Sequence, residues 1–288
     1  MKRHLPILLM LSLSATARAQ VANADTPVRI QTDVPTVEKR YEEAPLQNYD
    51  AEVLQLANQG DAKAQLTIAK ALDFGSGGRM NKAEAVRWYL RAAEQDNSEA
   101  QYYLSIHYFR GDGVQRSSLK AVDWCLRSAE LGYAPAQYSL GVCYANGIGT
   151  ERSIEDAVNW WHKAADQGNA DAQCEMGVYC QKESQEDGAE EEAINWYRMA
   201  ANQGHARAQE YLGKCYYDGT GVKKSYAEAV KWYRLSAEQG NTHAQNNLGV
   251  CYQQGHGVEQ SDQEAQKWFQ MAARKGHELA KANSRKNQ

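Results

Sequence analysis

Small and apolar residues recur along this chain with a fixed period of 36 residues. An Ala-Gln pair begins at Ala64, Ala100, Ala136, Ala172, Ala208 and Ala244. A tryptophan keeps the same interval, at Trp88, Trp124, Trp160, Trp196, Trp232 and Trp268, and only Trp161 lies outside the register. A constant period of this length is typical of a solenoid, in which each repeat buries its apolar face against its neighbours.

Each unit begins with a predicted helix, here called helix A. In the unit 136–171, Ala136, Leu140 and Tyr144 are spaced four residues apart, which places them on one helix face. Gly147 and Gly149 predict the end of this helix, since glycine accepts the left-handed conformation at a helix C-terminus. Four further glycines lie inside the A helices and indicate close approach by a neighbouring helix, at Gly141, Gly177, Gly213 and Gly249.

A second helix, helix B, follows the turn. Ser153, Ser225 and Ser261 each stand three residues before an acidic residue, the pattern of a capping box at a helix N-terminus. An apolar stripe then follows at helical spacing, formed by Ala157, Trp160, Trp161, Ala164 and Ala165. We therefore expect the tryptophans to fill the space between repeats.

The segment Ala208 to Gly240 carries the motif A-Q-x-x-L-G, then Y-x-x-G-x-G-V, then A-x-x-W-Y-x-x-A-A-x-x-G almost in full. In this motif the chain resembles the Sel-one-like repeat (SLR) proteins, which are relatives of the tetratricopeptide repeats. The resemblance implies an all-α fold, a right-handed α/α superhelical solenoid of about six 36-residue helix-turn-helix repeats. It also implies a scaffold for other proteins, usually without catalysis.

The pattern divides the chain into five parts. Lys2 and Arg3 precede an apolar run and the segment Ala17-Arg18-Ala19, which together predict a cleaved secretory signal peptide. We therefore expect export to a periplasm or secretion, with no transmembrane segment after cleavage. The parts are a signal peptide at 1–19, a flexible linker at 20–47, a capping helix at 48–63, six repeats at 64–99, 100–135, 136–171, 172–207, 208–243 and 244–279, and a C-terminal cap or tail at 280–288.

Charge and spacing argue against several classes of function. The formal net charge is −4, and no polybasic face indicates nucleic-acid binding. Phosphate-loop and C-x-x-C motifs do not occur, so no cofactor and no metal are expected. The histidines occupy different repeat positions and are expected at the surface or at helix ends.

An exported protein is expected to meet an oxidising compartment, where cysteines can form disulfides. Cys143, Cys215 and Cys251 share one position of helix A, where burial is expected. Secreted SLR relatives carry cysteine pairs about eight residues apart across a turn, and this chain has no pair so spaced. We expect core thiols that are mostly free, and disulfides stay an open alternative.

Ser117 and Lys120 are the candidate catalytic residues, because they match the S-x-x-K pair of penicillin-recognising enzymes. Ser117 aligns with the capping serines, and the companion motifs S-D-N and K-T-G are absent. We expect no enzyme. The alternative is a β-lactamase-like or cell-wall hydrolase, as some secreted SLR relatives are labelled.

The turn of the fourth repeat, 181–192, lacks the glycines and is rich in glutamate. It is either a solvated loop or an acidic docking site for a basic partner or cation.

If the tetratricopeptide relationship holds, a concave groove is lined by positions two, six, nine and ten after the alanine of each Ala-Gln pair. These positions vary between repeats, and their aromatic, amide and charged residues suit an extended partner protein or peptide. The candidates are Tyr102, Ile106, Phe109, Arg110, Tyr138, Val142, Asn146, Lys214, Tyr217, Asp218, Asn246, Gln253 and Gln254. An unused, merely solvated face is the other interpretation.

Overall fold

A computed structural model describes residues 50–76, 78, 80–182 and 188–286, and within these ranges the protein is all-α, with fourteen helices. The predicted signal peptide and the whole of the predicted linker lie outside them. Six A helices are α2 (Ala62–Phe74), α4 (Ser98–Arg110), α6 (Ala134–Asn146), α8 (Ala170–Lys182), α10 (Ala206–Asp218) and α12 (Thr242–Gln254). Six B helices are α3 (Lys82–Ala93), α5 (Ser118–Glu130), α7 (Ile154–Asp166), α9 (Ala189–Asn202), α11 (Tyr226–Glu238) and α13 (Asp262–Arg274). The shorter helices α1 (Ala51–Asn58) and α14 (Glu278–Lys286) cover the two ends of the array.

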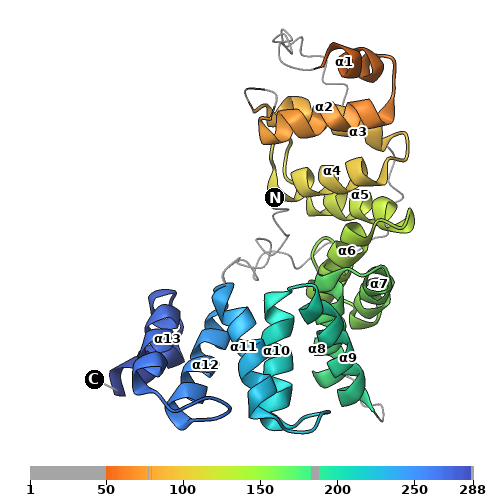
Figure 1. The fold of residues 1–288 in the computed structure, drawn as a ribbon. Coiled ribbons are helices and arrows are strands. Elements are labelled where there is room, and N and C mark those ends of the chain that lie inside the picture. The colour runs from red at the N-terminus through yellow and green to blue at the C-terminus, as the bar shows by residue number, and fades with distance from the viewer. Residues whose placement is uncertain (1–49, 77, 79, 183–187, 287–288) are drawn as a thin grey trace. The chain divides into compact units, whose positions relative to one another are not determined.

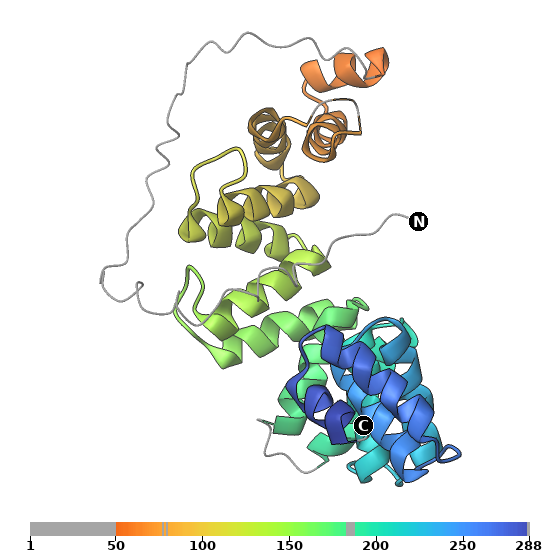
Figure 2. The same ribbon diagram turned by 90° about the vertical axis from the view of Figure 1, so that its left-hand side faces the viewer.

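The helices stack in chain order. Each packs mainly against the helix before it and the helix after it, and the A–B pairs within repeats make the most extensive contacts. Figures 1 and 2 show the pairs following one another along the stack. The fold is therefore a solenoid of six helix pairs. None of the helices in the described ranges has the length and apolarity needed to cross a bilayer.

The B helices begin at the predicted serine caps. The Ser153 hydroxyl accepts a hydrogen bond from the backbone N–H of Asp156 at 3.1 Å. Ser225 and Ser261 make the same contact at 3.3 and 3.2 Å. The hydroxyl of each serine satisfies a helix N–H that has no partner within the helix, so the predicted serine caps are confirmed.

The second glycine of the turn has a packing role in the second, third, fifth and sixth repeats. At Gly149 an added Cβ would lie 2.4 Å from the backbone oxygen of Ser118, the first residue of α5 in the preceding repeat. No side chain fits at that distance. The turn of one repeat therefore rests directly on helix B of the repeat before it.

The glycines inside the A helices admit a neighbouring aromatic ring. A Cβ at Gly141 would lie 2.5 Å from the Trp161 indole and 2.9 Å from the Ala157 carbonyl oxygen. The close approach predicted from the glycines is confirmed.

The regularly spaced tryptophans pack against clusters shared by successive repeats, as expected. The space beside the glycines is filled instead by the following residue, which is the more buried of the two in five repeats, at Tyr89, Trp161, Tyr197, Tyr233 and Phe269. The regular Trp160 is only partly buried, and the Lys163 ammonium lies 4.0 Å from its ring centroid. The difference arises because one helical step turns the residue after the tryptophan toward the glycine.

A ladder of glutamine side chains explains the Ala-Gln signature. The Gln137 amide donates to the backbone oxygen of Ala129, at the end of the preceding B helix, at 3.1 Å. All six A helices repeat this bond, from Gln65, Gln101, Gln137, Gln173, Gln209 and Gln245. Gln167 then donates to the oxygen of the Gln137 side chain at 2.7 Å. Each complete rung joins the ends of two successive B helices through the A helix between them.

Two rungs of this ladder are incomplete. Leu131 and Lys275 stand where the other repeats have the second glutamine. The side-chain oxygens of Gln101 and Gln245, which that glutamine would contact, are buried and accept no hydrogen bond in the structure. The glutamine pair, and not its first member alone, is what satisfies this buried amide.

Candidate groove of the A helices

The predicted groove positions differ in how accessible they are. Four candidates are buried, namely Phe109, Tyr138, Val142 and Asn246. Four are partly buried, namely Tyr102, Ile106, Tyr217 and Gln253. Five are exposed, namely Arg110, Asn146, Lys214, Asp218 and Gln254. Position ten is exposed in every repeat, and position two is buried or half-buried in every repeat.

The aromatic candidates of the second and third repeats serve packing. Tyr138 retains 6% of its surface and belongs to a core cluster with Ala157, Trp161 and Met176. Tyr102 makes an edge contact with Tyr133, and burial raises its pKa above the ordinary value. Position two lies between neighbouring A helices, so a large side chain there is used inside the protein.

Three candidates of the fifth repeat meet in one pocket. Lys214, Tyr217 and Asp218 of α10 line a pocket of about 330 Å³ together with residues of α12. The remaining lining residues are Glu210, Tyr233, His243, Asn247 and Val250. We call this the α10–α12 pocket. Acidic, basic and aromatic side chains all face this pocket.

The carboxylate of Glu210 is the most constrained group of the pocket. The residue is 9% exposed, and Asn247 Nδ2 lies 3.4 Å from its Oε1. Burial raises the pKa of Glu210, and the nearby charges of His243, Lys214 and Arg207 only partly oppose this. A buried carboxylate with one weak donor is costly, and such a group in a pocket is a candidate for a binding residue.

Tyr217 is held in place at the side of the pocket. Its hydroxyl lies 3.1 Å from Gln254 Oε1 and 2.9 Å from His256 Nδ1. The ring of Tyr226 stacks on His256, with centroids 4.2 Å apart. These contacts hold the tyrosine ring in one position.

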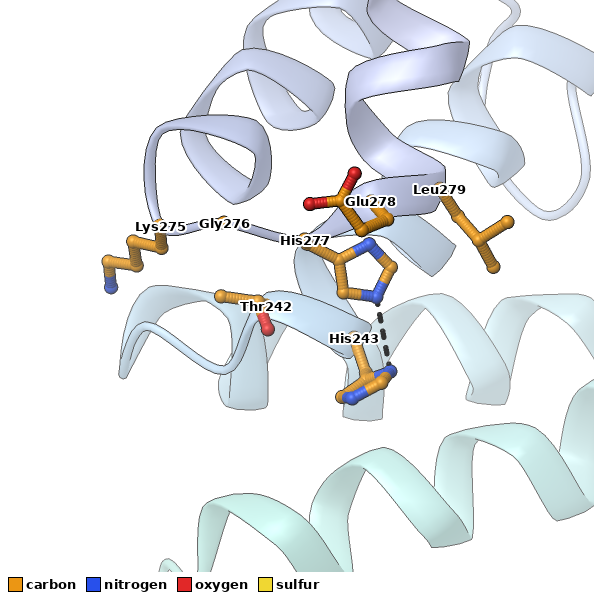
Figure 3. Close-up of a pocket in the computed structure, with 7 residues that line it drawn as sticks. All are labelled: Thr242, His243, Lys275, Gly276, His277, Glu278 and Leu279. Carbon is orange, nitrogen blue, oxygen red and sulfur yellow. Dashed lines mark hydrogen bonds between the residues drawn. The ribbon is translucent and has the colours of Figure 1, made fainter. Parts of the chain in front are cut away.

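A second hollow of about 400 Å³ lies at the start of α14 and shares His243 with the α10–α12 pocket. Figure 3 shows the His277 ring directed at His243, and their nitrogens are 3.1 Å apart. The other nitrogen of His277 accepts the N–H of Ala280 and so caps α14. His205 caps α10 in the same way, as expected for histidines at helix ends.

Sequence reasoning missed charged residues of the A helices, one residue before the alanine and three or six residues after it. Arg207 Nη1 pairs with Glu175 Oε1 at 2.6 Å between α8 and α10. Lys70 and Glu99 pair between α2 and α4. Opposite charges separated by about one period were the signal that could have identified them.

His107 contradicts the expectation of surface or helix-end histidines, because it is 3% exposed. Its Nε2 lies 3.3 Å from Asp73 Oδ1, which also contacts Lys82 Nζ at 2.5 Å. The Tyr89 hydroxyl donates to the other oxygen of Asp73 at 3.2 Å. Burial opposes ionisation of Asp73, but these partners outweigh it and lower the pKa of that carboxyl. The negative charge of Asp73 is therefore balanced by side chains of the protein itself.

The remaining chemical candidates have structural roles. Ser117 Oγ accepts the N–H of Lys120 at 3.3 Å as an N-cap, and the Lys120 ammonium lies over the Tyr108 ring. Burial raises the pKa of Cys143 and Cys215 to about 11 and that of Cys251 to about 12, which disfavours reactive thiolates. Within the described ranges, no group of three or more His, Cys, Asp or Glu side chains is placed to hold a metal ion. The glutamate-rich turn lies partly outside these ranges, and Glu190, Glu191 and Glu192 form the first turn of α9.

The repeat family model described as Sel1 repeat matches residues 62–97, 98–133, 134–169, 170–205, 206–241 and 242–277. The chain belongs to the Sel1 repeat family. This division of the Sel1 repeats begins two residues before the Ala-Gln pair, where the A helices themselves begin. Sel1 repeat proteins are in general scaffolds for protein–protein interaction and typically not enzymes.

Two solved structures are similar to this chain. One is c5321, a protective antigen of uropathogenic Escherichia coli with an SLR fold, at 32% identity and a TM-score of 0.74 over 81% of this chain. The match spans 50% of the E. coli chain. The other is a Sel1 repeat protein from Oxalobacter formigenes, at 31% identity and a TM-score of 0.68, covering 74% of this chain and 86% of that one. No curated protein matches the chain.

Proposed function

We propose that this protein is an exported, non-enzymatic scaffold that binds an extended segment of a partner protein along the A-helix face of its fifth and sixth repeats. The observation that carries this proposal is the α10–α12 pocket, in which Lys214, Tyr217 and Asp218 converge. The family membership supports the general role, and the pocket supports the location.

Earlier repeats offer less to a partner. In the second and third repeats the corresponding aromatic residues Phe109 and Tyr138 are buried, so binding there would need the core to open. The last two repeats have polar groups at the surface and a tyrosine that is already positioned. A pre-positioned ring binds at low entropic cost.

The test uses peptides selected from a random dodecapeptide display library against the full mature chain. Affinities of selected peptides are measured by calorimetry for the wild type, Asp218→Ala and Tyr217→Ala. Tyr217→Ala should lose about thirtyfold or more, as expected for a central binding residue, and Asp218→Ala, at the exposed edge of the pocket, should lose less. Lys163→Ala, on the exposed side of α7, is the matched control and should bind like the wild type. Unchanged affinity in both pocket variants would place recognition elsewhere.

Export is the second element of the proposal and rests on the N-terminal sequence pattern. Protein recovered from a bacterial periplasm or culture medium should begin at Gln20, which intact mass spectrometry decides. Recovery with residues 1–19 still attached would contradict cleavage at Ala19.

A further inference from the structure

The α8–α10 junction, one repeat before the α10–α12 pocket, shows how this fold neutralises a carboxylate between A helices. Arg207 of α10 reaches Glu175 of α8 with both terminal nitrogens, at 2.6 and 3.4 Å. Its guanidinium also lies over the Tyr211 ring, 5.4 Å from the centroid. The carboxylate is thus held by a planar cation that packs on a tyrosine, the arrangement that suits arginine and not lysine.

At the next junction the equivalent cation is missing. His243 occupies the position that Arg207 has one repeat earlier, and it is engaged with His277. Glu210 of α10 faces this junction with only the Asn247 amide near one of its oxygens. The carboxylate therefore lacks the partner that the preceding junction supplies.

Neighbouring cations do not fill the gap. Arg207 lies one turn before Glu210, but its guanidinium is held by Glu175 of α8 and by the Tyr211 hydroxyl. Lys214 lies one turn beyond Glu210, yet the two form no ion pair in the described structure and Lys214 is exposed. Burial also raises the pKa of Glu210, so the protein bears a cost for keeping this group.

The walls of the pocket complete the arrangement. Tyr217 and Tyr233 line it from α10 and α11, and Asp218 adds a second, exposed carboxylate. A flat cation can stack against tyrosine while its N–H groups reach a carboxylate. A pocket of about 330 Å³ accommodates one long side chain.

We propose that the α10–α12 pocket binds the guanidinium of an arginine side chain carried by the partner's extended segment. The inference rests on the proposed function and names the chemistry of its central contact. Glu210 accepts the guanidinium N–H groups, Tyr217 provides a stacking surface, and Asp218 adds attraction at the exposed edge. The partner supplies the cation that Arg207 supplies at the preceding junction.

The direct test uses a blocked pentapeptide, acetyl-Gly-Ala-Arg-Ala-Gly-amide, and its citrulline counterpart, which has the same shape without the charge. Each is titrated to millimolar concentration into the full mature chain, and amide shifts are followed by NMR. The arginine peptide should give saturable shifts at Lys214, Tyr217 and Asn247, and the citrulline peptide should bind at least about tenfold more weakly.

Matched variants assign the contact. Glu210→Gln keeps the size of the side chain and an oxygen that can accept from Asn247, and should weaken the arginine peptide by at least about tenfold. Glu238→Gln, at the exposed end of α11, makes the same chemical change elsewhere and should bind like the wild type. Asp218→Asn should weaken binding less. Should Glu210→Gln not fold, as seen from its amide spectrum, Asp218→Asn alone decides: unchanged affinity there overturns the proposal.

Equal binding of the two pentapeptides, no saturable shifts, or full affinity in Glu210→Gln each overturns the arginine proposal. Display-selected peptides separate this failure from failure of the proposed function. If the selected peptides lose affinity for the Tyr217→Ala variant but carry no arginine, the proposed function stands and the arginine proposal fails. If the arginine pentapeptide binds at Glu210 but no selected peptide depends on the pocket, the arginine site stands and the proposed scaffold function fails.

Discussion

The first three repeats and the last three share the same helix packing but present different residues on the outer face of their B helices. On the B helices, Arg91, Arg127 and Lys163 lie over the tryptophan rings of repeats one to three. The same position holds Met199, Leu235 and Met271 in repeats four to six, and all three are exposed. The repeat core does not determine what this outer position presents.

The A helices differ between the halves in how charge is balanced. In the first repeat, Asp73 is satisfied by Lys82, His107 and Tyr89. In the fifth repeat, Glu210 is also buried but has one weak donor. The first carboxylate is balanced by its neighbours, and the second is not. Two buried carboxylates of the same fold therefore differ in their sets of donors.

The largest expected difference in stability between repeats concerns the buried aromatic residue that faces the A helix. Tyr197→Ala in the fourth repeat removes a fully buried ring in contact with Gly177 and should lower the free energy of unfolding by about 3–5 kcal/mol. In the second repeat, Ser105 and Cys125 replace the glycine and the aromatic, so Cys125→Ala should cost about 1–2 kcal/mol. Urea unfolding followed by circular dichroism measures both, with the exposed Met199→Ala as control. Equal losses at Tyr197 and Cys125 would contradict the packing described.

Asp73→Asn should lower stability at pH 7 by about 2 kcal/mol, since it removes the charge that three side chains contact. The folded pKa of Asp73 is lower than the ordinary value of 3.8. The stabilisation is therefore present above about pH 3.8 and is lost as the pH falls further. Urea melts at pH 7, 5 and 3 should show the difference between wild type and variant shrinking at the lowest pH. A difference independent of pH would mean that the network contributes only through packing.

Completing the glutamine ladder should stabilise the protein. Leu131→Gln and Lys275→Gln each supply the donor that Gln101 and Gln245 lack, and each should add about 1 kcal/mol. Leu131→Asn is the control, because its amide is one methylene too short to reach. Thermal melting distinguishes the variants. Identical gains for the glutamine and asparagine variants would show that removing an exposed leucine, and not the new rung, is responsible.

Glu210→Gln should have the smallest effect, a gain of less than about 1 kcal/mol at pH 7. The folded pKa of Glu210 is raised above 4.5, so the native state is penalised while the carboxylate is ionised. The penalty is relieved as the pH falls through the folded pKa, and the variant's advantage should vanish there. A loss of stability at pH 7 would indicate that Glu210 is a structural residue. That result would remove the contrast with Asp73.

The sequence predicted the repeat, the serine caps and the small-residue contacts because each is local or strictly periodic. It could not show that Tyr138 is buried, because this depends on how closely two A helices approach. Nor could it show that His107 lies beside Asp73, since the two are far apart in the chain and only stacking brings them together. Lys214, Tyr217 and Asp218 were found because variable polar residues at helical spacing mark a surface. Glu210 was missed although it occupies position two of the fifth repeat, because the sequence does not show that its carboxylate is buried between two A helices.

The glutamine ladder also has a consequence for how the protein unfolds. Complete rungs at Gln167, Gln203 and Gln239 pass through the A helices of repeats three, four and five, whereas the A helices of the second and sixth repeats lie in incomplete rungs. In a linear array, cooperativity depends on coupling between neighbours. Repeats three to five should therefore open as one unit, and their A-helix amides should exchange hydrogen more slowly than those of repeats two and six. The α10–α12 pocket lies where this unit meets the last repeat, so its groups from α10 should be held more rigidly than those from α12.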